Sequence, residues 1–132
     1  MIQIELSGEP VAKARARVFK RKSGAMGSFT PKKSQNYSDA LAIAATYIMK
    51  GRKPLEGALV VVVRCFMTIP KSLSKKVECG DAHIKKPDLD NIIKQLDALN
   101  GIVWKDDSQI TSLTAMKMYS NYPRILIEVG HL

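Results

Sequence analysis

The most distinctive part of this sequence lies in its second half and reads Lys85-Lys86-Pro87-Asp88-Leu89-Asp90-Asn91-Ile92-Ile93-Lys94. A second acidic pair, Asp106-Asp107, follows it closely. These carboxylates stand out because the chain as a whole is basic, with 21 Lys and Arg against 12 Asp and Glu. Aspartates that crowd together repel one another, and their pKa values rise unless something positive shares the site. Since Mg²⁺ prefers carboxylate oxygens, the two pairs indicate a divalent-cation site without Cys or His ligands.

Asp88 and Asp90 are two residues apart, so in an extended segment both side chains point to the same side. The apolar spacing from Asn91 to Leu99 predicts a helix that begins just after them. Asp90 alone could therefore be the N-cap of this helix, but capping does not explain a second acidic pair downstream. Lys94 lies one helical turn after Asp90, where it either forms an ion pair with Asp90 or directs its charge at a bound phosphate.

Several further motifs accompany this stretch. After Lys94 come Asp97-Ala98-Leu99-Asn100-Gly101 and Asp106-Asp107-Ser108-Gln109-Ile110. Nearer the N-terminus the chain contains Gly8-Glu9-Pro10-Val11-Ala12-Lys13-Ala14-Arg15-Ala16-Arg17 and Phe29-Thr30-Pro31-Lys32-Lys33. Together with Pro87-Asp88-Leu89-Asp90-Asn91, these motifs resemble the RusA family of endodeoxyribonucleases, which resolve Holliday junctions in bacteria and their phages.

The resemblance implies an enzyme that resolves four-way DNA junctions by paired phosphodiester hydrolysis in recombination and repair. It implies that Asp88, Asp90 and Asp107 hold one or two Mg²⁺ or Mn²⁺ ions and are catalytic together with Lys94, which stabilises the transition state. If Asp106 and Asp107 lie on a strand they face opposite ways, so only one of them is a ligand. The family pattern selects Asp107 and leaves Asp106 to support the ligands. The resemblance also implies a homodimer, whose two-fold axis supplies two identical sites for two symmetric cuts.

Composition sets further bounds. A length of 132 residues fits one domain spanning residues 1–132, and 45% hydrophobic residues suffice for a core. No apolar run approaches the ~20 residues of a membrane span, and we expect no signal peptide. Given the resemblance, we expect a cytoplasmic protein of a bacterial or phage-infected cell. The net charge of +9 favours a polyanion such as DNA as the partner.

Much of that charge lies in an N-terminal segment that we call the basic arm, from Pro10 to Tyr37. It holds eight basic residues and no acidic one: Lys13, Arg15, Arg17, Lys20, Arg21, Lys22, Lys32 and Lys33. We expect a mobile arm or loop that lies along phosphates, because Arg and Lys neutralise phosphate charge and Arg binds phosphate in a bidentate way. The predicted DNA-binding residues are Lys13, Arg15, Arg17, Lys32, Lys33, Lys85 and Lys86.

The periodicity of the remaining chain predicts an α+β fold with a mixed sheet of about five strands and two main helices. The expected helices are 33–50 and 91–99, and the expected strands are 2–6, 59–66, 102–104, 110–120 and 124–129. The unbroken β-branched run of the strand 59–66 favours a central position covered on both faces. The strands 110–120 and 124–129 are expected to pair as an antiparallel hairpin across Asn121-Tyr122-Pro123. Trp104 is expected in the core.

Two other classes of protein remain open. One is a non-catalytic basic DNA-binding protein, in which the aspartates are caps and surface acids. The other is a metal-dependent hydrolase of a small phosphoester, against which the basic arm argues because a small substrate does not need it.

Overall fold

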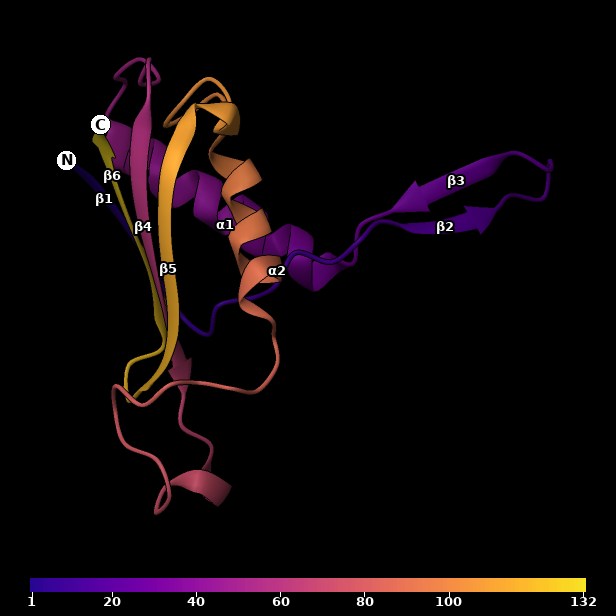
Figure 1. Cartoon of the computed structure of the whole chain (residues 1–132). Helices are drawn as coiled ribbons and strands as arrows, with labels where there is room; N and C mark the ends of the chain where they lie inside the picture. The colour runs from indigo at the N-terminus through magenta and orange to yellow at the C-terminus, as the bar shows by residue number, and fades with distance from the viewer.

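The computed structural model describes all 132 residues and confirms the α+β class (Figure 1). The strands are β1 (Ile2–Ser7), β2 (Arg17–Lys20), β3 (Met26–Phe29), β4 (Leu59–Thr68), β5 (Ile110–Ser120) and β6 (Arg124–His131). The helices are α1 (Lys32–Met49) and α2 (Leu89–Ile93), with short 3₁₀ helices at Lys71–Leu73, Lys94–Leu99 and Asp107–Gln109. Four strands form a mixed sheet in the order β1-β6-β4-β5, and β2 and β3 form a separate pair. None of the helices is long and apolar enough to cross a membrane.

Strand β4 occupies the interior of the sheet, as its apolar run predicts, and pairs with β5 on one side and β6 on the other. Its side chains alternate, with Val61, Val63 and Cys65 buried and the intervening side chains only half-buried. The predicted cover on both faces is therefore wrong. Both helices lie on the same face of the sheet (Figure 1), and β-branched residues suit the pleated surface of either face.

The predicted hairpin of the last two strands is also wrong. β5 runs parallel to β4 and β6 runs antiparallel to it, so the most apolar strand separates two strands that are neighbours in sequence. The connection Asn121–Pro123 must then cross the end of β4, a span of two inter-strand spacings or about 10 Å, which a short extended segment can reach. A turn sequence fixes where the chain reverses, but it does not determine whether the two strands that it connects pair directly or with another strand between them.

Helix α1 forms where its sequence predicts and packs on the sheet through Tyr37, Leu41, Ala45 and Met49. Tyr37 is a core residue, whereas Tyr47 is 78% exposed. Against the expectation of a third apolar strand, Ile102 and Val103 continue a turn that begins at Gly101, which has a φ of +81°, and Trp104 forms only isolated β-bridges with Leu55 and Asn100. Trp104 is fully buried as predicted, and its indole Nε1 donates to Asn100 Oδ1 at 2.6 Å.

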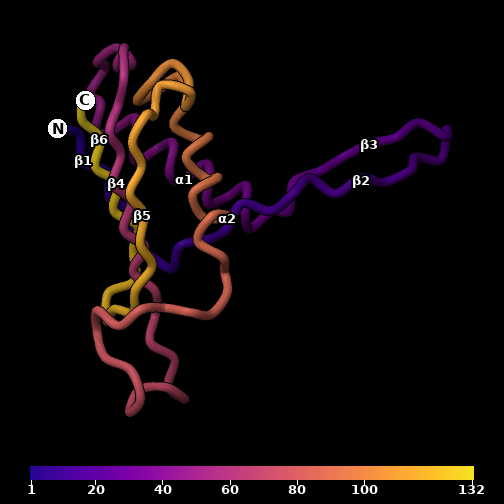
Figure 2. Tube along the Cα trace, viewed as in Figure 1, coloured from indigo at the N-terminus to yellow at the C-terminus, as the bar shows by residue number.

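The middle of the basic arm, residues 17–29, is a β-hairpin rather than an irregular loop, and the end of the arm belongs to α1. β2 pairs antiparallel with β3, and the pair projects away from the body of the molecule (Figure 2). Its strands contain Val18, Phe19 and Phe29, residue types that favour extended structure. Gly24, with a φ of +89°, lies in the turn between them.

A buried amide fixes the base of this hairpin to the helical layer. The Gln95 side chain is fully buried, and its Nε2 donates to the carbonyl oxygen of Val11 at 3.1 Å. Its Oε1 accepts a hydrogen bond from the Ser38 hydroxyl on α1. One side chain therefore joins the 3₁₀ helix Lys94–Leu99, α1 and the N-terminal segment.

We predict that Gln95→Leu destabilises the protein, because it leaves the Val11 carbonyl and the Ser38 hydroxyl without partners. An unpaired buried polar group costs about 1–3 kcal/mol. The free energy of unfolding, measured by urea titration, should fall by that amount. Gln35→Leu is the matched control, since Gln35 is exposed on α1 and bonds only to the side chain of Asp39. A surface change of this kind shifts stability by about 0.5 kcal/mol or less. Equal effects of the two variants would contradict the role of Gln95.

Candidate active site

Two predicted acids lie at the start of α2, which begins two residues earlier than predicted. Asp88 occupies the N-cap position and Asp90 the first turn, and the helix has no side-chain capping hydrogen bond. The interpretation of Asp90 as an N-cap is therefore wrong. Neither carboxylate forms an ion pair with a basic residue. Folding of the helix thus leaves both carboxylates available.

Lys117 fixes the segment that leads into this helix. Its ammonium on β5 donates hydrogen bonds to the carbonyl oxygens of Lys85 and Pro87, the latter at 2.6 Å. The positions of Asp88 and of the start of α2 therefore depend on the edge strand of the sheet. Sequence reasoning missed this residue, because a lone lysine in a strand carries no signal for a partner 30 residues away.

Lys94 does not pair with Asp90, so the ion pair, one of the two alternatives for Lys94, is absent. Its Nζ donates instead to Asn91 Oδ1 at 3.1 Å. Lys94 lines a cavity of about 330 Å³ together with Asp97 and Asp107. A cation and two acids thus share one depression between the helical layer and β5.

Within this cavity Asp97 and Asp107 lie side by side. Their contact raises the pKa of the Asp107 carboxyl, with smaller contributions from desolvation and from the charge of Asp106. Lys13 reaches the outer side of Asp97, with its Nζ 3.5 Å from Asp97 Oδ2. The sequence left open whether Asp97 faces the site or has a solvated or capping role. Its place in the motif after Lys94 was the signal that could have indicated it.

Asp106 has a structural task of its own. It caps the 3₁₀ helix Asp107–Gln109 in a capping box, in which its side chain accepts from the backbone N–H of Ser108 and Gln109 Oε1 accepts from the backbone of Asp106. Hydrogen bonds to Ser108 lower the pKa of Asp106. The opposite pKa shifts of Asp106 and Asp107 mark the first as a satisfied cap and the second as a strained neighbour of another acid.

The structure places Asp88 and Asp107 in two different depressions, and the exposed Asp90 lines neither of them. Asp88 lines a cavity of about 380 Å³ with Ala12, Lys86 and Asn91, whereas Asp107 lies in the cavity of Lys94. No three acidic, His or Cys side chains lie close enough together to hold an ion as they stand. The donors are nonetheless chemically suited to a hard cation, since all are carboxylates and the Asp97–Asp107 pair is electrostatically strained. The residues fit the ion by donor type, and gathering three of them needs side-chain movement.

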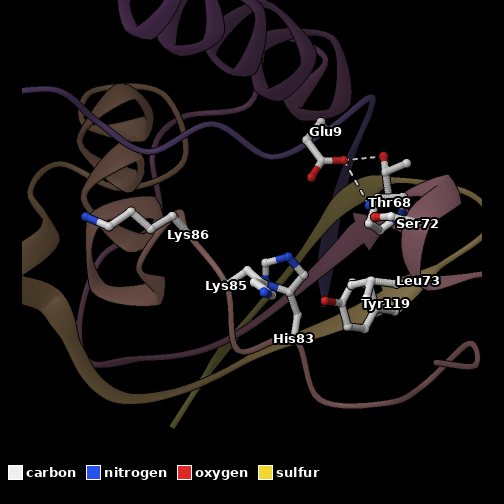
Figure 3. Close-up of a pocket in the computed structure, with 9 residues that line it drawn as sticks. Glu9, Thr68, Ser72, Leu73, His83, Lys85, Lys86 and Tyr119 are labelled. Carbon is white, nitrogen blue, oxygen red and sulfur yellow. Dashed lines mark hydrogen bonds between the residues drawn. The ribbon is translucent and has the colours of Figure 1, made fainter. Parts of the chain in front are cut away.

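The predicted DNA-binding residues fall into three groups. Arg17 belongs to the projecting hairpin, and Arg15 lies exposed at its base. Lys32 and Lys33 are exposed in the first turn of α1, whereas Lys13 turns toward the acids. Lys85 and Lys86 line a third cavity of about 460 Å³ (Figure 3).

This third cavity has a polar wall. Glu9 accepts hydrogen bonds from the backbone N–H and the hydroxyl of Thr68, and the His83 ring lies 4.7 Å from that of Tyr119 (Figure 3). Burial lowers the pKa of His83, as does the charge of Lys117. Lys86 also lines the cavity of Asp88, so the two depressions adjoin at this lysine.

Comparison with known proteins decides the family. The profile described as "Endodeoxyribonuclease RusA" matches residues 7–130. The chain belongs to the RusA endodeoxyribonuclease family. A relative from Bacillus subtilis (strain 168), named "Uncharacterized protein YqaN", is 33% identical over 136 residues, covering 97% of this chain and 94% of the relative. The RusA match includes the hairpin, both depressions and every predicted site residue.

We predict that Asp97→Asn stabilises the metal-free protein at neutral pH. The folded-state pKa of Asp107 is raised, so its charged form opposes folding. That penalty is absent at a pH low enough to protonate Asp107 in both the folded and the unfolded protein. It grows as the pH rises from the pKa of Asp107 in the unfolded state through its pKa in the folded state, and it is complete at neutral pH. In EDTA, the melting temperature of Asp97→Asn should exceed that of the wild type at pH 7, with the difference shrinking toward pH 3.

Asp39→Asn serves as the control, because Asp39 is an exposed aspartate on α1 whose hydrogen-bond partner is Gln35. It should show no such pH-dependent gain. A lower melting temperature for Asp97→Asn at pH 7 would mean that the ion pair of Asp97 with Lys13 outweighs the repulsion.

Proposed function

We propose that this protein is a Mg²⁺- or Mn²⁺-dependent endonuclease that resolves four-way DNA junctions in recombination and repair, and that it works in the cytoplasm. Membership of the RusA family supports an endodeoxyribonuclease. The observation that carries the proposal is the start of α2, where Asp88 and Asp90 make no capping hydrogen bond and no ion pair. Carboxylates without structural partners in a chain of net charge +9 are best explained by chemistry on a polyanion.

The proposed ligands of the ion are Asp88, Asp90 and Asp107, with Asp97 as a further carboxylate beside Asp107. A bound divalent ion supplies an activated water and charge stabilisation at the scissile phosphate. Asp106 remains a supporting residue, because its carboxylate is engaged in the capping box.

Lys94 is proposed to stabilise the negative charge that develops on the attacked phosphate. Its hydrogen bond to Asn91 Oδ1 holds the ammonium at the cavity of Asp107. A cation placed in advance costs no reorganisation at the moment of reaction. Lys85 and Lys86, on the segment that Lys117 fixes, are proposed to bind the phosphates beside the cut.

We further propose a homodimer. Resolution needs two symmetric cuts in opposing strands, and a two-fold axis supplies two identical sites. The outer edge of β5 supports this proposal only in its first half. Residues 80–83 bond to β5 at Lys117–Tyr119, whereas the stretch from Ile110 to Ala115 has β4 as its one partner strand. An unpaired strand edge is a template for pairing with another chain.

We predict that cleavage depends on a divalent ion, because only carboxylates are available as donors at the site. A synthetic four-way junction and a matched linear duplex should be incubated with Mg²⁺, with Mn²⁺ and with EDTA. We expect cutting of the junction with either metal and none in EDTA. Undiminished cutting in EDTA would exclude the metal-dependent mechanism, and equal cutting of the duplex would exclude junction specificity.

We predict that Asp90→Asn separates an enzyme from a DNA-binding protein. A neutral amide cannot replace a charged ligand, so single-turnover cleavage should fall more than about a hundredfold. Junction affinity should persist or increase, because a negative charge facing phosphate has gone. Lys94→Ala should lower the rate by about 10²–10³ and the affinity much less, since its charge acts mainly in the transition state.

Asp39→Asn and Lys76→Ala are the matched controls, exposed residues outside the cavities described above. Both should cut at the wild-type rate. A wild-type rate in Asp90→Asn would remove the proposed site and favour a non-catalytic DNA-binding protein.

A further inference from the structure

The hairpin of β2 and β3 has an unusual surface for a basic arm. It exposes four large apolar side chains, with Val18 at 66%, Phe19 at 42%, Met26 at 64% and Phe29 at 50% of their full exposure. Binding phosphate requires charge alone, so these residues are not explained by attraction to the DNA backbone. Exposed apolar clusters on a soluble protein mark binding surfaces.

The register of the hairpin sorts these residues onto two faces. Arg17 pairs with Phe29 and Phe19 pairs with Gly27, so the two phenylalanines share one face. Their ring centroids lie 6.1 Å apart with the planes tilted by 53°. Val18 and Met26 lie on the opposite face.

A glycine seats the first ring against the backbone. A Cβ placed on Gly27 would lie only 2.6 Å from Phe19 Cζ and 2.9 Å from Arg21 Nε. The Phe19 ring therefore occupies the space that any other side chain at position 27 would take. Arg21 lies over this ring with its Cζ 5.8 Å from the centroid, near the outer limit of a cation–π contact. We call Phe19, Phe29, Gly27 and Arg21 the aromatic platform.

We propose that the aromatic platform is a binding site for unstacked nucleobases. Aromatic rings and guanidinium planes are the surfaces on which exposed bases stack. The arm around the platform carries eight basic residues and no acidic one, so its charge is complementary to a nucleic acid. Base pairs inside a linear duplex cover one another's faces. The platform therefore distinguishes a branch point or single strand from duplex, which simple phosphate binding cannot do.

The anchoring of the hairpin connects the platform to the candidate active site. The backbone N–H of Lys13 donates to the Asn91 carbonyl at 2.8 Å, and that of Ala14 donates to Ser34 Oγ at 3.0 Å. The chain that leads into β2 is thus held against α2, which carries Asp90. The platform extends from the cutting site and selects DNA in which bases near the cut are unpaired. This inference rests on the proposed nuclease function for its biological meaning, but the binding site can be tested without catalysis.

The test compares four double variants of the full chain. Phe19→Ala/Phe29→Ala removes the rings, and Phe19→Leu/Phe29→Leu keeps apolar cohesion within the hairpin but removes the flat π faces. Phe19→Tyr/Phe29→Tyr retains both rings. Val18→Ala/Met26→Ala is the matched control on the opposite face. Melting temperatures and circular dichroism show whether each variant folds.

Two DNA probes are used. One is a four-way junction with one unpaired 2-aminopurine nucleotide at its crossover, and the other is a linear duplex with the same sequence. Binding is measured in EDTA by the emission of 2-aminopurine, over a range of salt concentrations. We expect the Ala and Leu pairs to lose about tenfold in affinity for the junction, together with the emission change, while duplex affinity stays unchanged. The Tyr pair and the Val18/Met26 control should bind as the wild type does. The salt dependence should be the same in all variants, because none removes a charge.

Several outcomes would contradict the proposal that bases stack on the aromatic platform. Wild-type junction affinity and emission in the Leu pair would exclude base stacking. An equal loss in the Val18/Met26 control would assign the effect to general disruption of the hairpin. A changed oligomeric state in the Ala pair, with unaltered emission, would show that a second copy of the chain covers this face. If the wild type binds the unpaired base as expected but cuts no junction with any metal, the platform stands and the nuclease proposal fails.

Discussion

The buried amide of Gln95 is the contact on which the placement of the other parts depends. Helix α1 and the segment before the hairpin are separate pieces of chain. Gln95 hydrogen-bonds to Ser38 in the first and to Val11 in the second from a third piece, the 3₁₀ helix Lys94–Leu99. Apolar packing by Ile92, Leu96 and Leu99 holds the helical layer on the sheet, but such packing tolerates sliding. Directional hydrogen bonds in a low-dielectric interior do not, so they set the register between the hairpin and the acids.

A second constraint acts on the acids through the edge strand. Lys117 holds the carbonyls of Lys85 and Pro87, which places the start of α2 beside β5. β5 follows directly on the turn that carries Asp107. β5 therefore positions Asp88 and Asp90 through the side chain of Lys117. It positions Asp107 because the chain runs directly from that residue into β5. The two depressions are neighbours for this reason, although they draw on acids from separate motifs.

Some elements of this fold follow from local sequence patterns, and others do not. The 3.6-residue period of α1, the alternation in β1 and the apolar run of β4 each predict their element, because each is a local signal. The strand predicted at residues 102–104 does not form. Val103 and Trp104 are buried as its apolar pattern indicates, but in a turn and an isolated bridge. The β2–β3 hairpin was not predicted, because its glycine and basic residues are typical of a loop. In the structure, cross-strand pairing such as that of Phe19 with Gly27 orders it. Sequence reasoning proposed Asp88, Asp90, Asp107 and Lys94 by chemical type. It left the role of Asp97 open and gave no signal for Lys117.

By itself the sequence determined most of the helices and strands, the clustering of carboxylates and the net positive charge. These properties belong to single residues or to runs shorter than a helix, so they persist whatever the rest of the chain does. Only the tertiary structure decided that β4 separates β5 from β6, that Asp97 meets Asp107, and that Gln95 reaches a carbonyl 84 residues away. Such contacts are set by which layers bury their apolar faces together, and no local pattern encodes that choice.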